Sequence, residues 1–133
     1  RGLADDAVRA LVGNQLTATV RADLAALVAC YASPVDYYDE GRKTSTVLRR
    51  DLQSYRRIWP HYQIGDLSEI TVNSTGDPDI KTASYSYVFV ARNPQNGKQS
   101  RGLAHEHITV RNFGGRPQIT RCRQTVTDRQ KNF

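Results

Sequence analysis

The chain has 133 residues, the length of one domain, with 38% hydrophobic residues and a formal net charge of +6. Its mean hydropathy is −0.61, and no apolar run approaches the ~20 residues of a membrane span, so we expect no membrane-spanning segment. The positive charge is mostly arginine scattered along the chain without a run of like charges, so no nucleic-acid partner is expected.

Two amphipathic helices are predicted at the start of the chain. Residues 4–18 carry apolar side chains at intervals of three and four, the spacing of a helix with one buried face: Val8, Leu11, Val12 and Leu16. A second helix follows Asp23, whose carboxylate can accept a hydrogen bond from the first turn. Ser33-Pro34 ends this second helix, because the residue before a proline is pushed out of the helical region.

A short strand and a third helix come next. Residues 35–38 read as an extended strand, and a helix begins after Gly41, capped by Thr44 or Ser45. Its apolar stripe has helical spacing, and we expect the stripe to be buried: Leu48, Leu52, Tyr55 and Trp59.

After Pro60 the pattern changes from helical to alternating, which predicts strands over 62–72, 80–91, 99–111 and 118–127. Asn96-Gly97 and Gly114-Gly115 mark turns between consecutive strands. The last residues, 129–133, are expected to form a frayed tail. The order of elements predicts one α+β domain over residues 1–133, with three N-terminal helices packed on a strongly curved antiparallel sheet and a pocket between them.

The element order and several segments resemble the nuclear transport factor 2-like superfamily. One segment is Ala22-Asp23-Leu24-Ala25-Ala26-Leu27 leading to Tyr31-Ala32-Ser33-Pro34-Val35. A bacterial branch of the superfamily is similar through Val35-Asp36-Tyr37-Tyr38, Arg50-Asp51 and Tyr55 on a helix, Trp59-Pro60, Tyr85-Ser86-Tyr87-Val88-Phe89 and Lys98-Gln99-Ser100-Arg101-Gly102. The resemblance implies a cone-shaped, cystatin-like roll with an internal pocket, in an accessory domain of unassigned function from a longer bacterial protein. The absence of methionine fits a piece of a longer chain.

Glu106 is the candidate for chemistry. Ala104, Ile108 and Val110 share its face of the strand, so its carboxyl is expected to point into the pocket. Desolvation there would raise its pKa and let it act as an acid or base. Enzymes resembling this fold use inward carboxylates with tyrosine or histidine partners, which would make Tyr87 or Tyr55 the proton partner of Glu106. The alternative, which we favour, is a structural carboxylate satisfied by a tyrosine or arginine on a neighbouring strand.

The predicted pocket residues are aromatic or acidic: Tyr31, Asp36, Tyr38, Tyr55, Trp59, Tyr85, Tyr87, Phe89 and Glu106. Asp36 has two interpretations. With Tyr55 or Arg50 it could form a polar clamp at the pocket mouth, or its carboxylate could anchor the loop 39–43, and we favour the second.

No metal or cofactor is expected. His105 and His107 lie on the strand face opposite Glu106 and lack a third ligand, while His61 is remote in sequence. The chain has no glycine-rich phosphate loop and no nucleophile elbow. The basic pairs Arg49-Arg50 and Arg56-Arg57 are interpreted as a solvated helix face rather than a site for phosphates, a membrane or an acidic partner.

Cys30 and Cys122 are either two buried core residues, which we favour, or one disulfide. A disulfide would imply an oxidising compartment. Together with the arginine content, the missing methionine and the resemblance, this favours a periplasmic or secreted location over a cytoplasmic one.

Three functions remain open. The favoured one is a non-catalytic accessory domain that binds a small molecule in the pocket. The second is a cofactor-free isomerase, cyclase or hydratase that uses Glu106 with Tyr87 or Tyr55. The third is a protein-interaction module that forms a homodimer through the exposed sheet face bearing Ser84, Ser86, His105 and His107.

Overall fold

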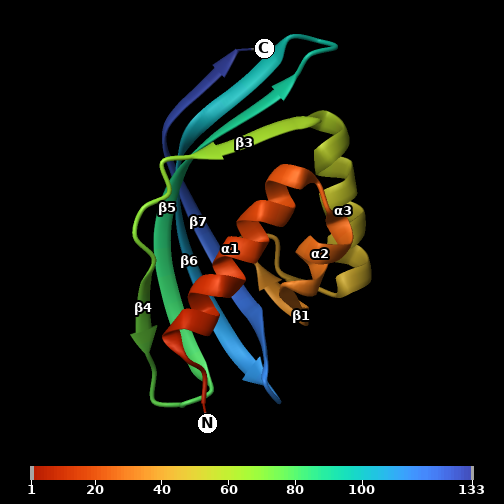
Figure 1. The fold of residues 1–133 in the computed structure, drawn as a ribbon. Coiled ribbons are helices and arrows are strands. Elements are labelled where there is room, and N and C mark those ends of the chain that lie inside the picture. Colours follow the sequence, from red (N-terminus) through yellow and green to blue (C-terminus); the bar gives the residue numbers. More distant parts are fainter. Residues whose placement is uncertain (1, 133) are drawn as a thin grey trace.

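Three helices lie against one face of the sheet (Figure 1). In the computed structural model, which describes residues 2–132, they are α1 (Asp5–Arg21), α2 (Leu24–Ala29) and α3 (Ser45–Ile58). The Asp23 carboxylate caps α2 by accepting a hydrogen bond of 3.1 Å from the Ala26 backbone N–H. Thr44 caps α3 in the same way through Val47, which decides between the two predicted caps.

Seven strands form one sheet in the order β2-β1-β7-β6-β5-β3, with β4 also paired to β5. Their bounds are β1 (Tyr31–Tyr37), β2 (Arg42–Lys43), β3 (His61–Gly65), β4 (Thr71–Ser74), β5 (Ile80–Asn93), β6 (Lys98–Phe113) and β7 (Arg116–Asn132). The predicted antiparallel meander of β5, β6 and β7 is confirmed. The sheet as a whole is mixed, because β1 pairs with β7 in parallel.

The long strands β5, β6 and β7 bend around the helices (Figure 1). Register shifts between β6 and β7 occur at Arg101/Leu103 and at Thr109/Val110. Such bulges bend a strand and increase its twist. At the first bulge Gly102 faces Phe89, and a Cβ placed on Gly102 would lie 2.9 Å from Val126 Cγ1 and 3.1 Å from Phe89 Cε2. Glycine therefore lets β6 pass close beneath the Phe89 ring.

The hydrophobic core lies between the sheet and the helices. Alternate residues of β6 are buried as expected, from Ala104 through Glu106 and Ile108 to Val110. Helix α1 contributes the apolar face that the sequence predicted, with Val8, Leu11, Val12 and Leu16 all buried. The largest wholly buried side chains are Leu48, Ile108, Ile119, Val8, Val12, Val35, Val110 and Cys122.

The predicted strand 62–72 is wrong, because the structure has two strands there. β3 pairs with residues 88–92 of β5, whereas β4 pairs with residues 81–84. Between them Asp66 adopts a left-handed conformation with φ of 50°. That conformation interrupts the extended backbone, so the chain leaves β5 and rejoins it further along.

The frayed tail predicted at 129–133 is also wrong over residues 129–132, and residue 133 lies outside the described residues. Gln130, Lys131 and Asn132 pair with Arg101, Ser100 and Gln99 of β6. The long β6 strand offers backbone hydrogen-bonding groups along its whole edge, and β7 extends to meet them.

Cys30 and Cys122 are buried free thiols, in agreement with the favoured interpretation. The Cys30 Sγ donates to the Ala26 carbonyl at 3.4 Å, and the Cys122 Sγ donates to the Asp36 carbonyl at 3.9 Å. The argument for an oxidising compartment from a disulfide therefore finds no support. Among the described residues, no helix has the length and apolar character needed to cross a bilayer.

Replacement of Gly102 by alanine tests the close approach at the first bulge. We expect Gly102→Ala to lower the free energy of unfolding by about 1–3 kcal/mol, because the added methyl group displaces Phe89 and Val126. Urea denaturation measures the loss. Gly76→Ala is the matched control, since no atom lies within 4 Å of a Cβ at Gly76. Equal stability of the two variants would show that the Phe89 contact imposes no constraint.

Candidate functional site

A cavity of about 490 Å³ lies between the helices and the sheet. Its wall is rich in aromatic side chains: Tyr31, Tyr37, Tyr38, Tyr55, Trp59, Tyr62, Tyr87 and Phe89. Aliphatic side chains complete the apolar part: Leu16, Leu24, Leu27, Leu52 and Ile64. An apolar wall with a few polar groups is typical of a small-molecule site.

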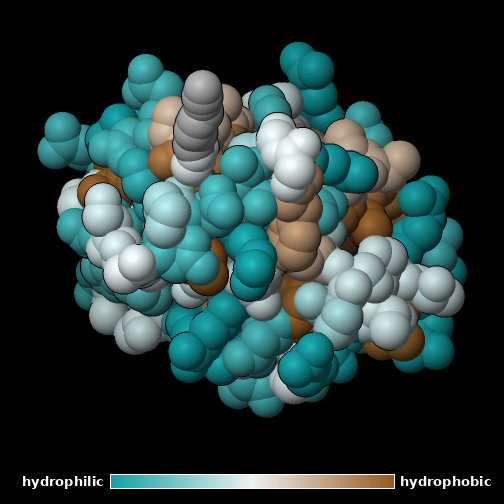
Figure 2. Space-filling view, turned by 90° about the horizontal axis from the view of Figure 1, so that it is seen from below, coloured by the Kyte–Doolittle hydropathy of each residue, from teal (hydrophilic) through white to brown (hydrophobic). Residues whose placement is uncertain are grey.

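A second hollow, of about 520 Å³, lies between residues 2–4 and the turn at residues 74–78. It is more open to solvent, and no aromatic side chain lines it. The end of the molecule that carries it is mainly hydrophilic, with only small, separate apolar areas (Figure 2). We therefore place the candidate site in the aromatic cavity.

The apolar stripe of α3 forms one wall of the cavity, and this corrects the prediction that the whole stripe is buried. Of its four side chains only Leu48 is buried, whereas Tyr55 is 45% exposed. Leu52, Tyr55 and Trp59 line the cavity instead. The stripe has the spacing of a core-facing helix because it faces the sheet. The cavity lies between the sheet and the part of the stripe that follows Leu48.

Two consecutive tyrosines at the end of β1 both line the cavity, although side chains of a strand normally alternate between faces. Tyr38 has a φ of 52°, in the left-handed region, and its N–H donates to the Cys122 carbonyl at 2.9 Å. This turn of the backbone brings the Tyr38 ring to the same side as the Tyr37 ring, with ring centroids 4.5 Å apart. A non-glycine residue with positive φ is strained, and such strain concentrates at functional sites.

Glu106 lies behind the wall of the cavity and is only 4% exposed. Its carboxyl accepts hydrogen bonds from three groups: the Tyr38 hydroxyl at 3.3 Å, the Tyr87 hydroxyl at 3.3 Å and the Gln124 side-chain amide. All three donors line the cavity. Glu106 thus joins β1, β5 and β7 through side chains that a ligand can contact.

Burial raises the pKa of Glu106 to about 7, and the hydrogen bonds from Gln124, Tyr87 and Tyr38 oppose the rise. No ion pair joins Glu106 to a cation within residues 2–132. Burial, and then the charge of Glu106, raise the pKa of both tyrosines above the usual range. The carboxyl is therefore close to half ionised at neutral pH, while both hydroxyls keep their protons.

The register between β6 and β7 decides which residue meets Glu106. Phe113 pairs with Arg116 beside the turn, and continuing that register would set Arg123 opposite Glu106. The bulge at Thr109/Val110 shifts the register by one residue, so Gln124 lies opposite Glu106 instead. The carboxyl is satisfied by tyrosines and an amide rather than by an arginine.

Asp36 has a different role from the one favoured from the sequence. Its carboxylate accepts a hydrogen bond of 2.9 Å from Arg123 and forms an ion pair with Arg121 at 3.6 Å. The hydrogen bond from Arg123 holds the pKa of Asp36 below its usual range. The favoured anchoring of loop 39–43 by this carboxylate is wrong, because the bulge brings Arg123 to the face where Asp36 lies.

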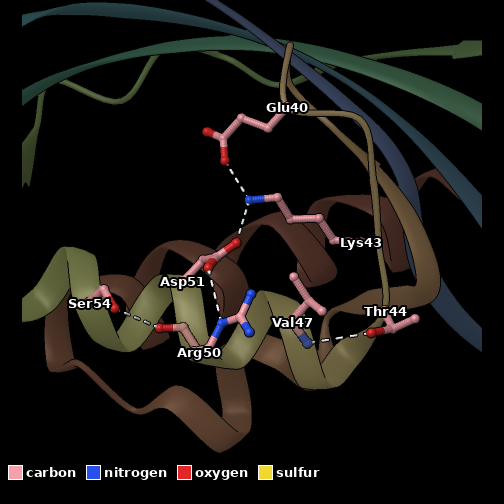
Figure 3. A network of polar contacts seen from close by, with 7 residues as sticks. All are labelled: Glu40, Lys43, Thr44, Val47, Arg50, Asp51 and Ser54. Carbon is pink, nitrogen blue, oxygen red and sulfur yellow. Dashed lines mark hydrogen bonds and ion pairs between the residues drawn. The ribbon is translucent and has the colours of Figure 1, made fainter.

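Lys43 anchors that loop instead (Figure 3). Its buried ammonium group donates to the Glu40 carboxylate at 2.5 Å and to the Asp51 carboxylate at 2.6 Å. Figure 3 shows Lys43 between the loop that carries Glu40 and helix α3, which carries Asp51. Both carboxylates line the cavity, so this pair of contacts fixes one side of its rim.

Six of the predicted pocket residues line the cavity: Tyr31, Tyr38, Tyr55, Trp59, Tyr87 and Phe89. The other three lie outside its wall: Asp36, Tyr85 and Glu106. Tyr85 donates to Gln15 at 3.4 Å, and Gln15 donates to the Tyr31 hydroxyl at 3.1 Å. Sequence reasoning missed Gln15, Arg56 and Tyr62. The helical pattern placed Gln15 beside Leu16 on the first helix, but nothing in that pattern indicated that Gln15 lines a cavity.

The histidines of β6 lie on the far face of the sheet, as predicted. His107 shares a hydrogen bond of 2.8 Å with Ser84, and His105 shares one of 3.2 Å with Thr127. Across residues 2–132, no group of three potential metal ligands gathers at a single point. The homodimer expected through this face stays a prediction.

Solved structures of low sequence identity share the fold. A scytalone dehydratase-like protein from Novosphingobium aromaticivorans has a TM-score of 0.83 at 10% identity, over 96% of this chain and 87% of that chain. LinA type 3, a hexachlorocyclohexane dehydrochlorinase from Novosphingobium barchaimii, has a TM-score of 0.81 at 8% identity, over 96% and 88%. A protein of unknown function from Nostoc punctiforme, with a cystatin-like fold, has a TM-score of 0.74 at 16% identity, over 96% of both chains.

By sequence, neither a known protein family nor a curated protein matches the chain. The structural likeness shows that the chain has the cystatin-like fold that its sequence predicted.

The raised pKa of Glu106 makes the stability of the protein depend on pH. The folded state holds this proton more tightly than the unfolded state, whose pKa is near 4.5. The resulting stabilisation is complete below pH 4.5 and is lost as the pH rises through about 7. From this group alone, the free energy of unfolding should fall by about 3 kcal/mol between these limits.

Urea denaturation of Glu106→Gln across pH 4.5–8 measures this contribution, because the variant cannot ionise at this position. We expect the fall in stability that the wild type shows over this range to be largely absent from the variant. Glu69→Gln, at an exposed position, is the matched control and should follow the wild type. An identical pH dependence in Glu106→Gln and the wild type would contradict the assignment.

Proposed function

We propose that this chain is a small-ligand-binding domain and that the aromatic cavity takes a molecule with an apolar body. The cavity carries the proposal: its volume of about 490 Å³ lies within the range of roughly 300–1,000 Å³ that is typical of ligand pockets. Its aromatic wall offers large apolar contact area together with hydroxyl groups that can orient a ligand.

The polar groups of the wall are already ordered without a ligand. Gln15 holds the Tyr31 hydroxyl at 3.1 Å, while Glu106 accepts from the hydroxyls of Tyr38 and Tyr87. A binding site whose side chains are fixed in advance loses less conformational entropy when the ligand enters. We therefore assign Glu106 the role of orienting the tyrosines rather than contacting the ligand.

The branch of the superfamily that the sequence resembles often occurs as an accessory domain of longer bacterial proteins, and its own activity is unassigned. For this chain we propose a binding role as such an accessory domain. Because Glu106 is already bonded to three donors and lies behind the wall, binding explains its position more directly than catalysis does.

Titration with N-phenyl-1-naphthylamine, a neutral dye that fluoresces in apolar surroundings, tests the proposal. We expect saturable binding at one site. Leu52→Trp should weaken it about tenfold or more, a loss of about 1.4 kcal/mol, because Leu52 lines the cavity and a larger ring fills its space. Ile58→Trp is the matched control: it lies on the same helix, is 57% exposed and stays outside the wall. Equal dye affinity in the two variants would place the dye elsewhere and contradict the proposal.

A second candidate, a cofactor-free acid–base enzyme, is favoured by one observation. Glu106 is half ionised near neutral pH, and the hydroxyls of Tyr38 and Tyr87 lie between it and the cavity. A tyrosine oxygen could take a proton from a substrate C–H bond while it gives its own proton to the carboxylate. A hexachlorocyclohexane dehydrochlorinase has the same fold.

Deuterium exchange tests this candidate without knowledge of the product. Cyclic ketones are incubated with the protein in D₂O, and NMR follows the loss of hydrogen beside the carbonyl group. Catalysis by Glu106 requires that the wild type accelerate exchange at least about tenfold over buffer, and that Glu106→Gln return it to the buffer rate. Glu69→Gln serves as the control. Lack of acceleration by the wild type would remove the enzyme candidate and leave dye binding unaffected.

A further inference from the structure

Around the cavity the acidic side chains have cationic partners, whereas two of the basic side chains have no acidic partner among the described residues. Its wall includes the acidic residues Glu40 and Asp51 and the basic residues Arg56, Arg129 and Lys131. Lys43, which lies outside the wall, forms ion pairs with both acidic residues. Within residues 2–132, no carboxylate forms an ion pair with Arg56 or Arg129. Among the described residues, the two arginines therefore carry positive charge that no carboxylate pairs with.

Two hydrogen bonds to α1 use two of the five N–H donors of the Arg56 side chain. Its Nη1 donates to the Thr19 carbonyl at 2.9 Å and its Nη2 to the Val20 carbonyl at 3.1 Å, at the end of α1. Its Nε is buried and has no hydrogen-bond partner within the described chain. Arg56 therefore lines the cavity with unused hydrogen-bonding capacity, which suits a ligand that brings an acceptor.

Arg56 and Arg129 lie over two neighbouring aromatic rings. The Arg56 guanidinium is 5.8 Å from the centre of the Tyr62 ring, and the Arg129 guanidinium is 5.8 Å from the centre of Phe89. These two rings stack at 6.2 Å with an interplanar angle of 7°. Two elements far apart in sequence, α3 and β7, thus each place a guanidinium group over one ring of this stacked pair.

The part of the wall that Glu106 supports is unsuitable for an anion. Glu106 lies there behind Tyr38 and Tyr87, and both hydroxyls already donate to its carboxyl. An anionic group there would be repelled by the carboxylate and would find its nearest donors occupied. Arg129 is exposed and Arg56 half-buried, so the basic groups lie nearer the mouth than the buried Glu106 does.

We infer that the ligand is an amphipathic anion, with an apolar body among the aromatic rings and a carboxylate or similar anionic group held by Arg56 and Arg129 at the mouth. The inference rests on the proposed ligand-binding function and specifies the class of molecule bound. Guanidinium groups suit such an anion because they donate several hydrogen bonds in a planar arrangement. A neutral ligand would leave the positive charges of the two arginines unpaired, and a cationic ligand would be repelled by them.

Two dyes of nearly equal shape test the inference. The anion 8-anilinonaphthalene-1-sulfonate has the body of N-phenyl-1-naphthylamine with one added sulfonate group. Fluorescence titrations at 150 mM salt, which screens long-range attraction, give the ratio of the two affinities. We expect the wild type to favour the anion, and Arg129→Gln and Arg56→Gln each to reduce the affinity ratio about tenfold, as loss of a charge-assisted hydrogen bond does.

The controls separate the site from general surface charge. Arg57→Gln changes the next residue of α3, which is exposed and outside the wall, and Arg101→Gln changes an exposed residue of β6 outside the wall. Both should keep the wild-type ratio. Because Arg56 also bonds α1, circular dichroism and thermal melting check that Arg56→Gln is folded. If Arg56→Gln does not fold, Arg129→Gln still tests the inference independently.

The outcomes distinguish the inference from the function on which it rests. If neither dye binds at the cavity, the ligand-binding function fails. If the neutral dye binds at the cavity but the wild type does not favour the anion, or Arg129→Gln keeps the wild-type ratio, the inference is wrong and the function stands. A loss in Arg57→Gln as large as that in Arg129→Gln would also overturn the inference, because it would show attraction to the whole basic surface.

Discussion

The buried carboxyl of Glu106 requires hydrogen-bond donors, and supplying them orders the centre of the fold. A carboxyl removed from water is destabilising unless its oxygens are bonded. Tyr38 from the end of β1, Tyr87 from β5 and Gln124 from β7 meet this need. The same three side chains line the cavity, so the polar groups that a ligand meets are held in place by a group behind them. The hydrogen bonds that satisfy the buried Glu106 carboxyl therefore also hold the side chains of the site in place.

One bulge makes this arrangement possible. The shift at Thr109/Val110 brings Gln124 rather than Arg123 opposite Glu106 and leaves Arg123 to bind Asp36. An arginine beside Glu106 would stabilise the carboxylate and lower its pKa. With an amide and two phenols as partners, burial dominates and the pKa is about 7. The position of a single extra residue in β7 therefore decides both the charge of the site and the partner of Asp36.

Polar contacts hold α3 on both sides of the residues that line the cavity. Lys43 joins the loop before α3 to Asp51, and Arg56 joins the other end of α3 to the last carbonyls of α1. Between these contacts Leu52 and Tyr55 face open space. The same contacts also place Glu40, Asp51 and Arg56 at the rim of the cavity, so the shape of the rim and its charge have a common origin.

The sequence by itself determined the three helices, the cap of α2, the meander of long strands and the burial of Glu106. These depend on spacing and on contacts between near neighbours, which a local pattern records. Tertiary structure alone decided the partners of Glu106 and Asp36, the left-handed turn at Tyr38 and the pairing of residues 130–132. It also decided that Arg56 and Arg129 lie over the stacked rings of Tyr62 and Phe89. Each of these depends on strand register or on the distance between α3 and the sheet. A one-residue shift in register reverses which face every side chain occupies, and periodicity within one strand cannot record it.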